Sequence, residues 1–458
     1  MHVASAAVAA AAPRGAGAAR RAFSRTPAIR EGHFPVLPMH PLPDQVSLPG
    51  FRPVPRTGVI YVSHRAAERG WRAGHPEWAN LGQGAPETSE LPGGRSRIGG
   101  VTLEESMHEY TPVAGHPLLR QRVADFYNSL FRKDKASKYT AANVCISGGG
   151  RSGLTRIAAS LGGINMGHFI PDYTAYEELL TIFKAFHPIP IVLDEAENYR
   201  ISPAELRDAI QRLGLGALLV SNPCNPTGQR AGAAELREWV AIAREEACTC
   251  IVDEFYSHYL YGDDPPGTIA SAAAAVEDVE TDPVLIIDGL TKNWRYPGWR
   301  VSWTVGPSVV IEQLASAGSF LDGGASHPLQ AAAAELLDPQ ETTREAAAIQ
   351  RCFRAKRDFM VSRLERMGIR VACPPAGAFY CWGDLRGLPE SLRDCFAFFE
   401  AGLEESVITV PGVFFDVNPG RRRPHSRYAH LARFSFGPDL ESVERGMDAL
   451  ERVIAKQR

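Results

Sequence analysis

Two basic residues, Lys292 and Arg300, are the part of this sequence that most suggests chemistry. The lysine lies in the run 288–300, which directly follows the apolar stretch 284–287, and the arginine comes eight residues after the lysine. A lysine at the end of a buried strand can form an imine with an aldehyde, while a fixed arginine binds a phosphate on the same molecule. Any single lysine is an ordinary surface amine roughly nine times in ten. Other segments therefore decide between a surface pair and a site for a phosphorylated aldehyde.

Three polar residues also follow apolar stretches that predict strands. Asn225 lies in a loop with two Asn-Pro pairs after 217–220, and Asp253 and Tyr256 come after 250–252. Open α/β sheets bind ligands at the carboxyl ends of their strands, which is where these residues are expected. Taken alone, however, an Asn-Pro pair indicates only a turn, and Asp253 could be an exposed acid in a loop. A buried carboxylate requires a cation, and a protonated pyridine nitrogen would serve. An aldehyde that carries both a phosphate and a pyridine ring is pyridoxal 5′-phosphate (PLP).

With these five residues in order, the chain resembles the class I/II aminotransferases, which are fold-type I PLP-dependent enzymes of the aspartate aminotransferase superfamily. The resemblance extends over most of the chain after about residue 75. It implies that Lys292 forms a Schiff base with the cofactor and that Asp253 pairs with the pyridine nitrogen. It also implies that Asn225 and Tyr256 hydrogen-bond the phenolic oxygen of the ring, while Arg300 clamps the phosphate.

Each of these roles answers a chemical demand. Loss of the substrate's α-proton is tolerable only if electrons flow toward a protonated ring nitrogen, which Asp253 maintains. Hydrogen bonds to the phenolic oxygen favour its ionised form. Once the substrate displaces Lys292, the free amine stands beside the α-carbon and acts as general base and acid. We therefore predict that Lys292, Asp253 and Tyr256 are catalytic.

A glycine-rich segment, 147–154, occupies the position of the family's phosphate cup. It precedes an expected helix, 154–161, so backbone N–H groups near Gly149, Gly150 and Arg151 can point at an anion. Arg151 stands where the family pattern has a small hydroxyl residue. It either adds a second cation to the phosphate or points into solvent.

A second departure from the family pattern lies just before the lysine. Gly289 stands where many relatives place a phosphate-binding serine, and Thr291 is expected to compensate in part.

Four further residues complete the predicted site. Tyr173 resembles the aromatic residue that stacks on the cofactor, and the alternative, a tyrosine that fills a core gap, has about one chance in three. Tyr110 resembles the tyrosine that reaches the partner subunit's phosphate, which implies a homodimer with shared active sites. Gly84 resembles a glycine at the substrate mouth. Arg433 resembles the arginine that grips the α-carboxylate, a task suited to a guanidinium fork.

The expected substrates are an amino acid and a 2-oxo acid. Relatives specific for aspartate or glutamate carry a further arginine past Arg300, and this chain has none from 304 to 342, so we expect an amino donor that is not a simple dicarboxylate. The same residues also serve cyclases or lyases similar to 1-aminocyclopropane-1-carboxylate synthase, and amino-acid oxidases. A non-catalytic PLP-binding regulator has about one chance in twenty, because the N-terminal segment is too short and alanine-rich for a helix-turn-helix.

Alternation of apolar strands with helical patterns such as 233–247 predicts an α/β fold. The resemblance implies a large PLP-binding domain with a mostly parallel seven-stranded sheet, at about 88–345. A smaller α+β domain would combine 59–87 with 346–458, joined through a long helix that starts near Glu341.

The composition is consistent with this interpretation but would not by itself have indicated it. The 458 residues are 45% hydrophobic and 22% charged, enough to bury a large core. A formal net charge of -3 gives no reason to expect nucleic acid as a partner. No window reaches the ~18 apolar residues of a membrane span. The eight cysteines include no CxxC pair, so free thiols are expected and a metal site is not.

The first 33 residues differ from the rest of the chain. They are rich in alanine and arginine, and no acid precedes Glu31, which is typical of an organelle transit peptide. A disordered tail, or a start codon assigned too early, explains the same composition. The expected location is therefore cytoplasmic or mitochondrial. Residues 34–58, with many prolines, predict an N-terminal arm.

Overall fold

The computed structural model describes residue 49 and residues 56–457. The possible transit peptide at 1–33, and the arm at 34–58 except for residues 49 and 56–58, lie outside the described residues. Among the described residues, each helix is too short or too polar to cross a bilayer.

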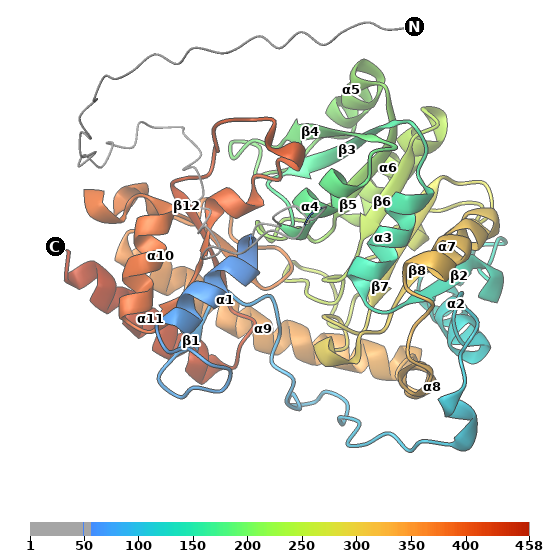
Figure 1. The fold of residues 1–458 in the computed structure, drawn as a ribbon, viewed down its shortest axis with the longest axis horizontal. Coiled ribbons are helices and arrows are strands. Elements are labelled where there is room, and N and C mark those ends of the chain that lie inside the picture. Colours follow the sequence, from blue (N-terminus) through green and yellow to red (C-terminus); the bar gives the residue numbers. More distant parts are fainter. Residues whose placement is uncertain (1–48, 50–55, 458) are drawn as a thin grey trace, which may run out of the picture.

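A seven-stranded sheet forms the centre of the larger part of the molecule (Figure 1). Every pairing is parallel except those of β8, which runs antiparallel to both neighbours. The fold class predicted from the sequence is confirmed. The strands, in spatial order, are β2 (Val144–Ser147), β8 (Ser302–Val305), β7 (Val284–Gly289), β6 (Thr249–Asp253), β5 (Leu215–Ser221), β3 (Asn165–Ile170) and β4 (His187–Val192).

Helices cover both faces of this sheet because its strands are apolar on both sides. Successive residues of one strand belong to different core clusters, as Ile251 and Val252 of β6 show. One face packs against α2 (Pro117–Phe131), α5 (Pro203–Leu213) and α6 (Ala233–Glu245), and the other against α3 (Gly150–Ser160), α4 (Ala175–Ile182) and α7 (Ser308–Leu321). Strand ends and helix starts therefore meet along one edge of the sheet.

The predicted long helix is α9, Pro339–Met367, which runs along the lower side of the view in Figure 1 and joins the two parts of the molecule. Asp338 caps its first turn, since the side chain accepts a hydrogen bond from the Glu341 N–H. Gly368, in the left-handed conformation, ends it. The helix starts two residues before the predicted position because Pro339 is accepted at the first helical position.

A second, three-stranded antiparallel sheet lies beyond α9 and is called the C-terminal sheet below. It contains β11 (Val410–Pro411), β12 (Leu431–Ser435) and β9 (Tyr380–Asp384). Around it lie α1 (Gly58–Glu68), α10 (Cys395–Glu404), α11 (Leu440–Ala455) and the two-stranded pair β1 (Ala79–Asn80) and β10 (Val407–Ile408). Helix α8 (His327–Ala334) lies instead against α2, on the side of the central sheet (Figure 1). N-terminal residues 79–80 thus pair with a strand more than 300 residues later in the chain.

Candidate active site

A cavity of about 400 Å³ lies at the carboxyl ends of β5 and β6, beside the loop after β7. The structure brings most of the predicted residues to its wall: Gly84, Gly150, Arg151, Tyr173, Asn225, Asp253, Tyr256, Thr291, Lys292, Arg300 and Arg433. Four of these side chains are basic and only Asp253 is acidic, so the cavity favours an anionic ligand.

Lys292 extends into the cavity, and its Nζ donates to the backbone carbonyl of Gly84. Burial lowers the pKa of this amine to about 7, helped by the positive charges of Arg433 and Arg300. A large share of Lys292 is then neutral near pH 7, which is the nucleophilic form of an amine. Gly84 leaves space for the Tyr380 hydroxyl, because a Cβ at position 84 would lie 2.9 Å from that oxygen.

The loop that carries Lys292 is held in place by its neighbours. Asn293 Nδ2 donates to Asp288 Oδ1 at 2.8 Å and to the Glu254 carbonyl at 2.9 Å, so it ties the loop to the ends of β7 and β6. Arg295, fully buried and with a positive φ of 59°, forms an ion pair with Glu345 of α9 at 2.7 Å. The lysine therefore stands on a loop that is fixed to the sheet and to α9.

Asp253, at the end of β6, is buried and receives a hydrogen bond from Tyr176. The Tyr176 hydroxyl lies 2.7 Å from Asp253 Oδ2, and the Phe255 N–H donates to Oδ1 at 3.3 Å. Burial raises the pKa of Asp253 to about 6, and the bond from Tyr176 opposes that rise. A carboxylate held in this way would gain most from a cationic partner.

Two residues from distant segments meet on the other side of the cavity. Arg433, on β12, donates from Nη1 to Asn225 Oδ1 at 2.8 Å and from Nη2 to the Gly82 carbonyl at 2.6 Å. Its buried Nε has no hydrogen-bond partner. A guanidinium that is buried without a paired carboxylate is suited to binding one from a ligand.

Tyr256 faces another tyrosine at the cavity wall. Its hydroxyl oxygen lies 2.8 Å from that of Tyr380, the first residue of β9. Burial raises the pKa of Tyr256 well above its usual value, so this phenol remains a neutral donor.

The cavity wall also carries the features of an anion site. Helix α3 begins at Gly150, four residues before the predicted start, and no side chain caps it. Gly149 has φ 100°, and a Cβ there would lie 2.0 Å from Arg300 Nη2, so only glycine allows the arginine to approach. The buried Thr291 Oγ1 has no hydrogen-bond partner. A helix start, a guanidinium and an unpaired hydroxyl together suit a phosphate.

The structure also explains the glycine before the lysine. Gly289 pairs with Ser302 across β7 and β8. A Cβ on Gly289 would lie 2.6 Å from both Cα and Cβ of Ser302, which leaves no room for a serine.

The Arg151 side chain lines the cavity, so it does not simply point away into solvent. Its Nη2 donates to the Tyr173 hydroxyl at 2.8 Å, and both residues line the wall. Tyr173 is partly buried and packs edge-on against Tyr176, with ring centroids 5.5 Å apart.

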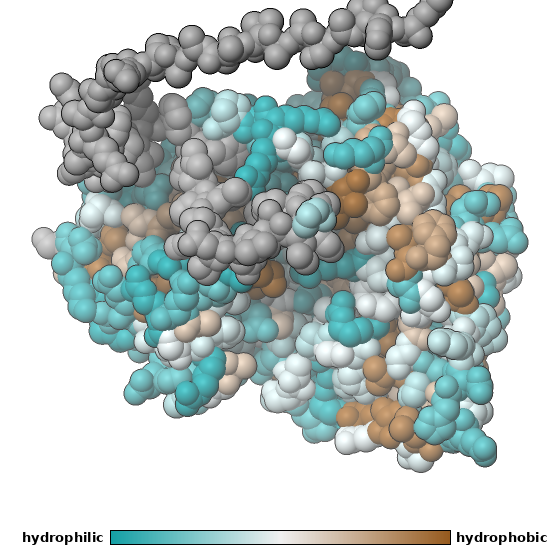
Figure 2. Space-filling view, viewed as in Figure 1, coloured by the Kyte–Doolittle hydropathy of each residue, from teal (hydrophilic) through white to brown (hydrophobic). Residues whose placement is uncertain are grey.

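Tyr110 lies outside the Lys292 cavity of its own chain, since its side chain is 95% exposed. It lines a separate surface hollow with Met107, Phe320 and His327. Figure 2 shows hydrophobic groups on the face of the molecule where α7 and α8 lie.

Sequence reasoning did not single out three residues that the structure places here. Tyr176 holds Asp253, Tyr380 contacts Tyr256, and Val59 of α1 reaches the cavity wall. Tyr176 could have been found from its spacing, because a residue three positions after Tyr173 shares its face of a helix start. Tyr380 and Val59 gave no such local signal.

A mostly parallel seven-stranded sheet with a smaller C-terminal sheet, and a basic cavity at the carboxyl edge of the larger one, is the architecture of the fold-type I enzymes. The family model for aminotransferase class I and II matches residues 76–450, so the chain belongs to that family and is a PLP-dependent aminotransferase.

Individual relatives agree with this family. The chain is 26% identical to an aspartate aminotransferase of Streptomyces avermitilis, over 77% of this chain and 83% of the relative. It is 26% identical to an aspartate/prephenate aminotransferase of Thermus thermophilus, over 77% and 85%. The solved structure of aspartate aminotransferase from Thermus thermophilus with maleate matches its fold, with a TM-score of 0.70, 24% identity and coverage of 88% and 100%.

Proposed function

We propose that this chain moves an amino group from an amino acid to a 2-oxo acid, with PLP attached covalently to Lys292. The observation that carries the proposal is the cavity itself, whose wall combines an amine with a pKa near 7, the residues of an anion site and a guanidinium without a paired carboxylate. Both PLP and its substrates are anionic, so the excess of basic side chains in the cavity matches the combined negative charge of cofactor and substrate.

The side chains fit the parts of the cofactor. Arg300, Thr291 and the N–H groups of Gly149 and Gly150 would bind the phosphate, and we assign Arg151 to the same end as a second cation. Asp253 would pair with the ring nitrogen, with Tyr176 fixing its orientation. Asn225 and Tyr256 would donate to the phenolic oxygen, and Tyr173 would lie against the ring.

When bound, PLP supplies the acceptor for the electrons that remain as the substrate's α-proton leaves. The residues of this chain supply the rest. Arg433 binds the α-carboxylate and orients the α-carbon toward Lys292. Once the substrate has displaced it, Lys292 Nζ removes the proton from the substrate's α-carbon as a general base and later returns a proton as a general acid. A group with a pKa near the working pH performs both steps best.

We propose an amino donor that is not a simple dicarboxylate. Support comes from the absence of arginine between 304 and 342. The relatives named above are aminotransferases, which favours transfer over elimination or oxidation.

We also propose a homodimer in which Tyr110 reaches the partner's phosphate. Tyr110 and Phe320, 95% and 74% exposed, line one surface hollow, and a second subunit would bury both. Light scattering of the loaded protein tests this, and a monomer with full activity would contradict it.

The domain division stays a proposal: 88–345 for the large domain, and 59–87 with 346–458 for the small one. The separate C-terminal sheet supports it.

The function is tested by adding PLP to the purified protein and titrating with neutral amino acids, aspartate and glutamate. We expect a visible absorption band that one neutral amino acid converts stoichiometrically to the pyridoxamine form. Lys292→Ala should lack the band, whereas Lys184→Ala, which removes a lysine outside the cavity, should keep it. A protein that stays colourless would contradict the proposal. A preference for aspartate or glutamate would overturn only the substrate assignment.

A further inference from the structure

One buried tyrosine contacts two different parts of the site. Tyr380 is fully buried at the start of β9, and its hydroxyl oxygen lies 2.8 Å from the hydroxyl oxygen of Tyr256. The face of the same ring lies 4.2 Å from Arg433 Cζ. Phe415 lies on the guanidinium as well, 4.9 Å away.

We propose that Tyr380 is a positioning residue that aligns Tyr256 through its hydroxyl and Arg433 through its ring. The inference rests on the proposed function, because it assigns Tyr256 to the cofactor and Arg433 to the substrate carboxylate.

The direction of the hydroxyl contact follows from counting hydrogens. A phenol has one O–H donor and two lone pairs. If Tyr256 gives its hydrogen to the cofactor's phenolic oxygen, the 2.8 Å contact can form only if Tyr380 donates to Tyr256. A hydroxyl that accepts a hydrogen bond is itself a stronger donor. Tyr380 therefore directs the Tyr256 hydrogen into the cavity and strengthens its bond to the ligand.

The ring contact serves a different purpose. Arg433 is held by Asn225 and Gly82 through its two Nη atoms, and both bonds act in the guanidinium plane. The ring of Tyr380 restricts movement out of that plane, and cation–π attraction adds to the restraint. The two restraints together fix the orientation of the arginine fork for a carboxylate.

Two substitutions separate these roles in the PLP-loaded protein. Tyr380→Phe removes the hydroxyl and keeps the ring, whereas Tyr380→Leu removes both. The first readout is the pKa of the visible absorption band, measured by pH titration. The second is the dissociation constant of propionate, a carboxylate that cannot react, measured from the same band.

We expect Tyr380→Phe to raise the pKa of the band by roughly 0.5 to 1 unit, since a weaker donor stabilises the ionised phenol less. Propionate binding should change less than about twofold in this variant and weaken by about threefold to thirtyfold in Tyr380→Leu. Tyr261→Phe is the matched control. It removes a buried hydroxyl that donates to the Ala378 carbonyl, outside the cavity, so it should move neither value.

An unchanged or lowered band pKa in Tyr380→Phe would overturn the hydroxyl role. Equal propionate affinity in the Phe and Leu variants would overturn the ring role. These failures are distinct from failure of the proposed function, in which the wild-type protein itself forms no band. Thermal unfolding of each variant confirms that it is folded.

Discussion

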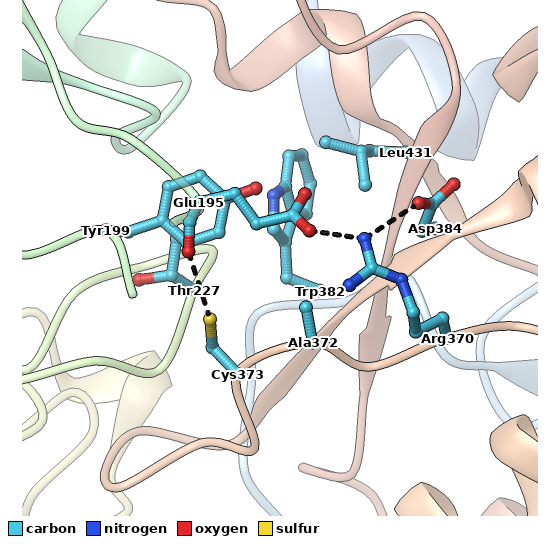
Figure 3. Close-up of a pocket in the computed structure, with 9 residues that line it drawn as sticks. All are labelled: Glu195, Tyr199, Thr227, Arg370, Ala372, Cys373, Trp382, Asp384 and Leu431. Carbon is cyan, nitrogen blue, oxygen red and sulfur yellow. Dashed lines mark hydrogen bonds and ion pairs between the residues drawn. The ribbon is translucent and has the colours of Figure 1, made fainter. Parts of the chain in front are cut away.

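Two charged cavities of this molecule lie between the central sheet and the C-terminal sheet, and they differ in how their charges are matched. The first is the Lys292 cavity, about 400 Å³ in volume. The second holds about 10 Å³, roughly the space of one water. Figure 3 shows this second site, called the Arg370 joint here, where Glu195, Arg370, Asp384 and their neighbours meet.

In the Arg370 joint each of these charges has a protein partner. The Arg370 guanidinium lies between Glu195, after β4, and Asp384, at the end of β9 (Figure 3). Arg386 also binds Asp384, at 2.6 Å. In the Lys292 cavity, by contrast, positive charges outnumber the single carboxylate and Arg433 Nε has no partner. Charges that are paired with one another around a space of one water join two parts of a protein, whereas charges without a protein partner around a large cavity indicate a ligand.

Among the tests of this contrast, the substitution Lys292→Ala should have the largest effect. We expect turnover to fall by roughly 10⁴-fold or more, because in the proposed function this one side chain both attaches the cofactor and transfers the proton. Stopped-flow measurement with an amino acid that is active on the wild-type protein gives the rate. Residual turnover within tenfold of wild type would show that Lys292 is not the catalytic amine.

The next test measures the charge state of Lys292 directly in the protein without cofactor. A pKa near 7, against the usual 10.5, means that the neutral amine becomes abundant at lower pH. At pH 7 its neutral fraction should exceed that of an ordinary lysine by on the order of a thousandfold. Brief acetic anhydride labelling across pH 5–10, followed by mass spectrometry, should give a midpoint near 7 for Lys292. The exposed Lys184 is the internal comparison, and equal midpoints would contradict the prediction.

A third test removes the unpaired guanidinium. Arg433→Ala should raise the KM for the amino acid by roughly 10- to 100-fold, the value of one or two charge-assisted hydrogen bonds. The visible band of the bound cofactor should remain, because Arg433 is assigned to the substrate. Loss of the band with unchanged KM would move Arg433 out of the substrate site.

The smallest effect is expected at the Arg370 joint. Arg370 is 55% exposed, and exposed ion pairs contribute about 0 to 1 kcal/mol. Arg370→Ala leaves Asp384 paired with Arg386, so unfolding free energy should fall by less than about 1 kcal/mol and KM should not change. Urea unfolding and a KM measurement check both parts. A KM increase as large as that of Arg433→Ala would remove the distinction between the two sites.

For some of the cavity residues that the sequence predicted, the position follows from strand ends alone. Asn225 and Lys292 follow β5 and β7, and Asp253 ends β6; these three strands lie side by side and run in parallel. The carboxyl ends of parallel strands meet at one edge, so apolar stretches followed by polar residues were sufficient.

The remaining contacts depend on geometry that no local pattern contains. Tyr380 meets Tyr256 because the C-terminal sheet folds back over the central one, and the pairing of Gly289 with Ser302 depends on strand register. Arg151 was ambiguous because its orientation depends on where α3 begins, and that helix starts four residues before the predicted start. Tertiary packing decides such positions, and packing joins segments far apart in the chain.

The close approach of β7 and β8 at Gly289 limits the mutational paths open to this enzyme. Because a Cβ there meets backbone atoms of Ser302 and Val301, replacement of Ser302 alone would not make a side chain at 289 tolerable. A serine or threonine at position 289 would therefore require that β7 and β8 first move apart. Thr291, which precedes the lysine and whose hydroxyl has no hydrogen-bond partner, is the more accessible position for a change in the proposed phosphate site.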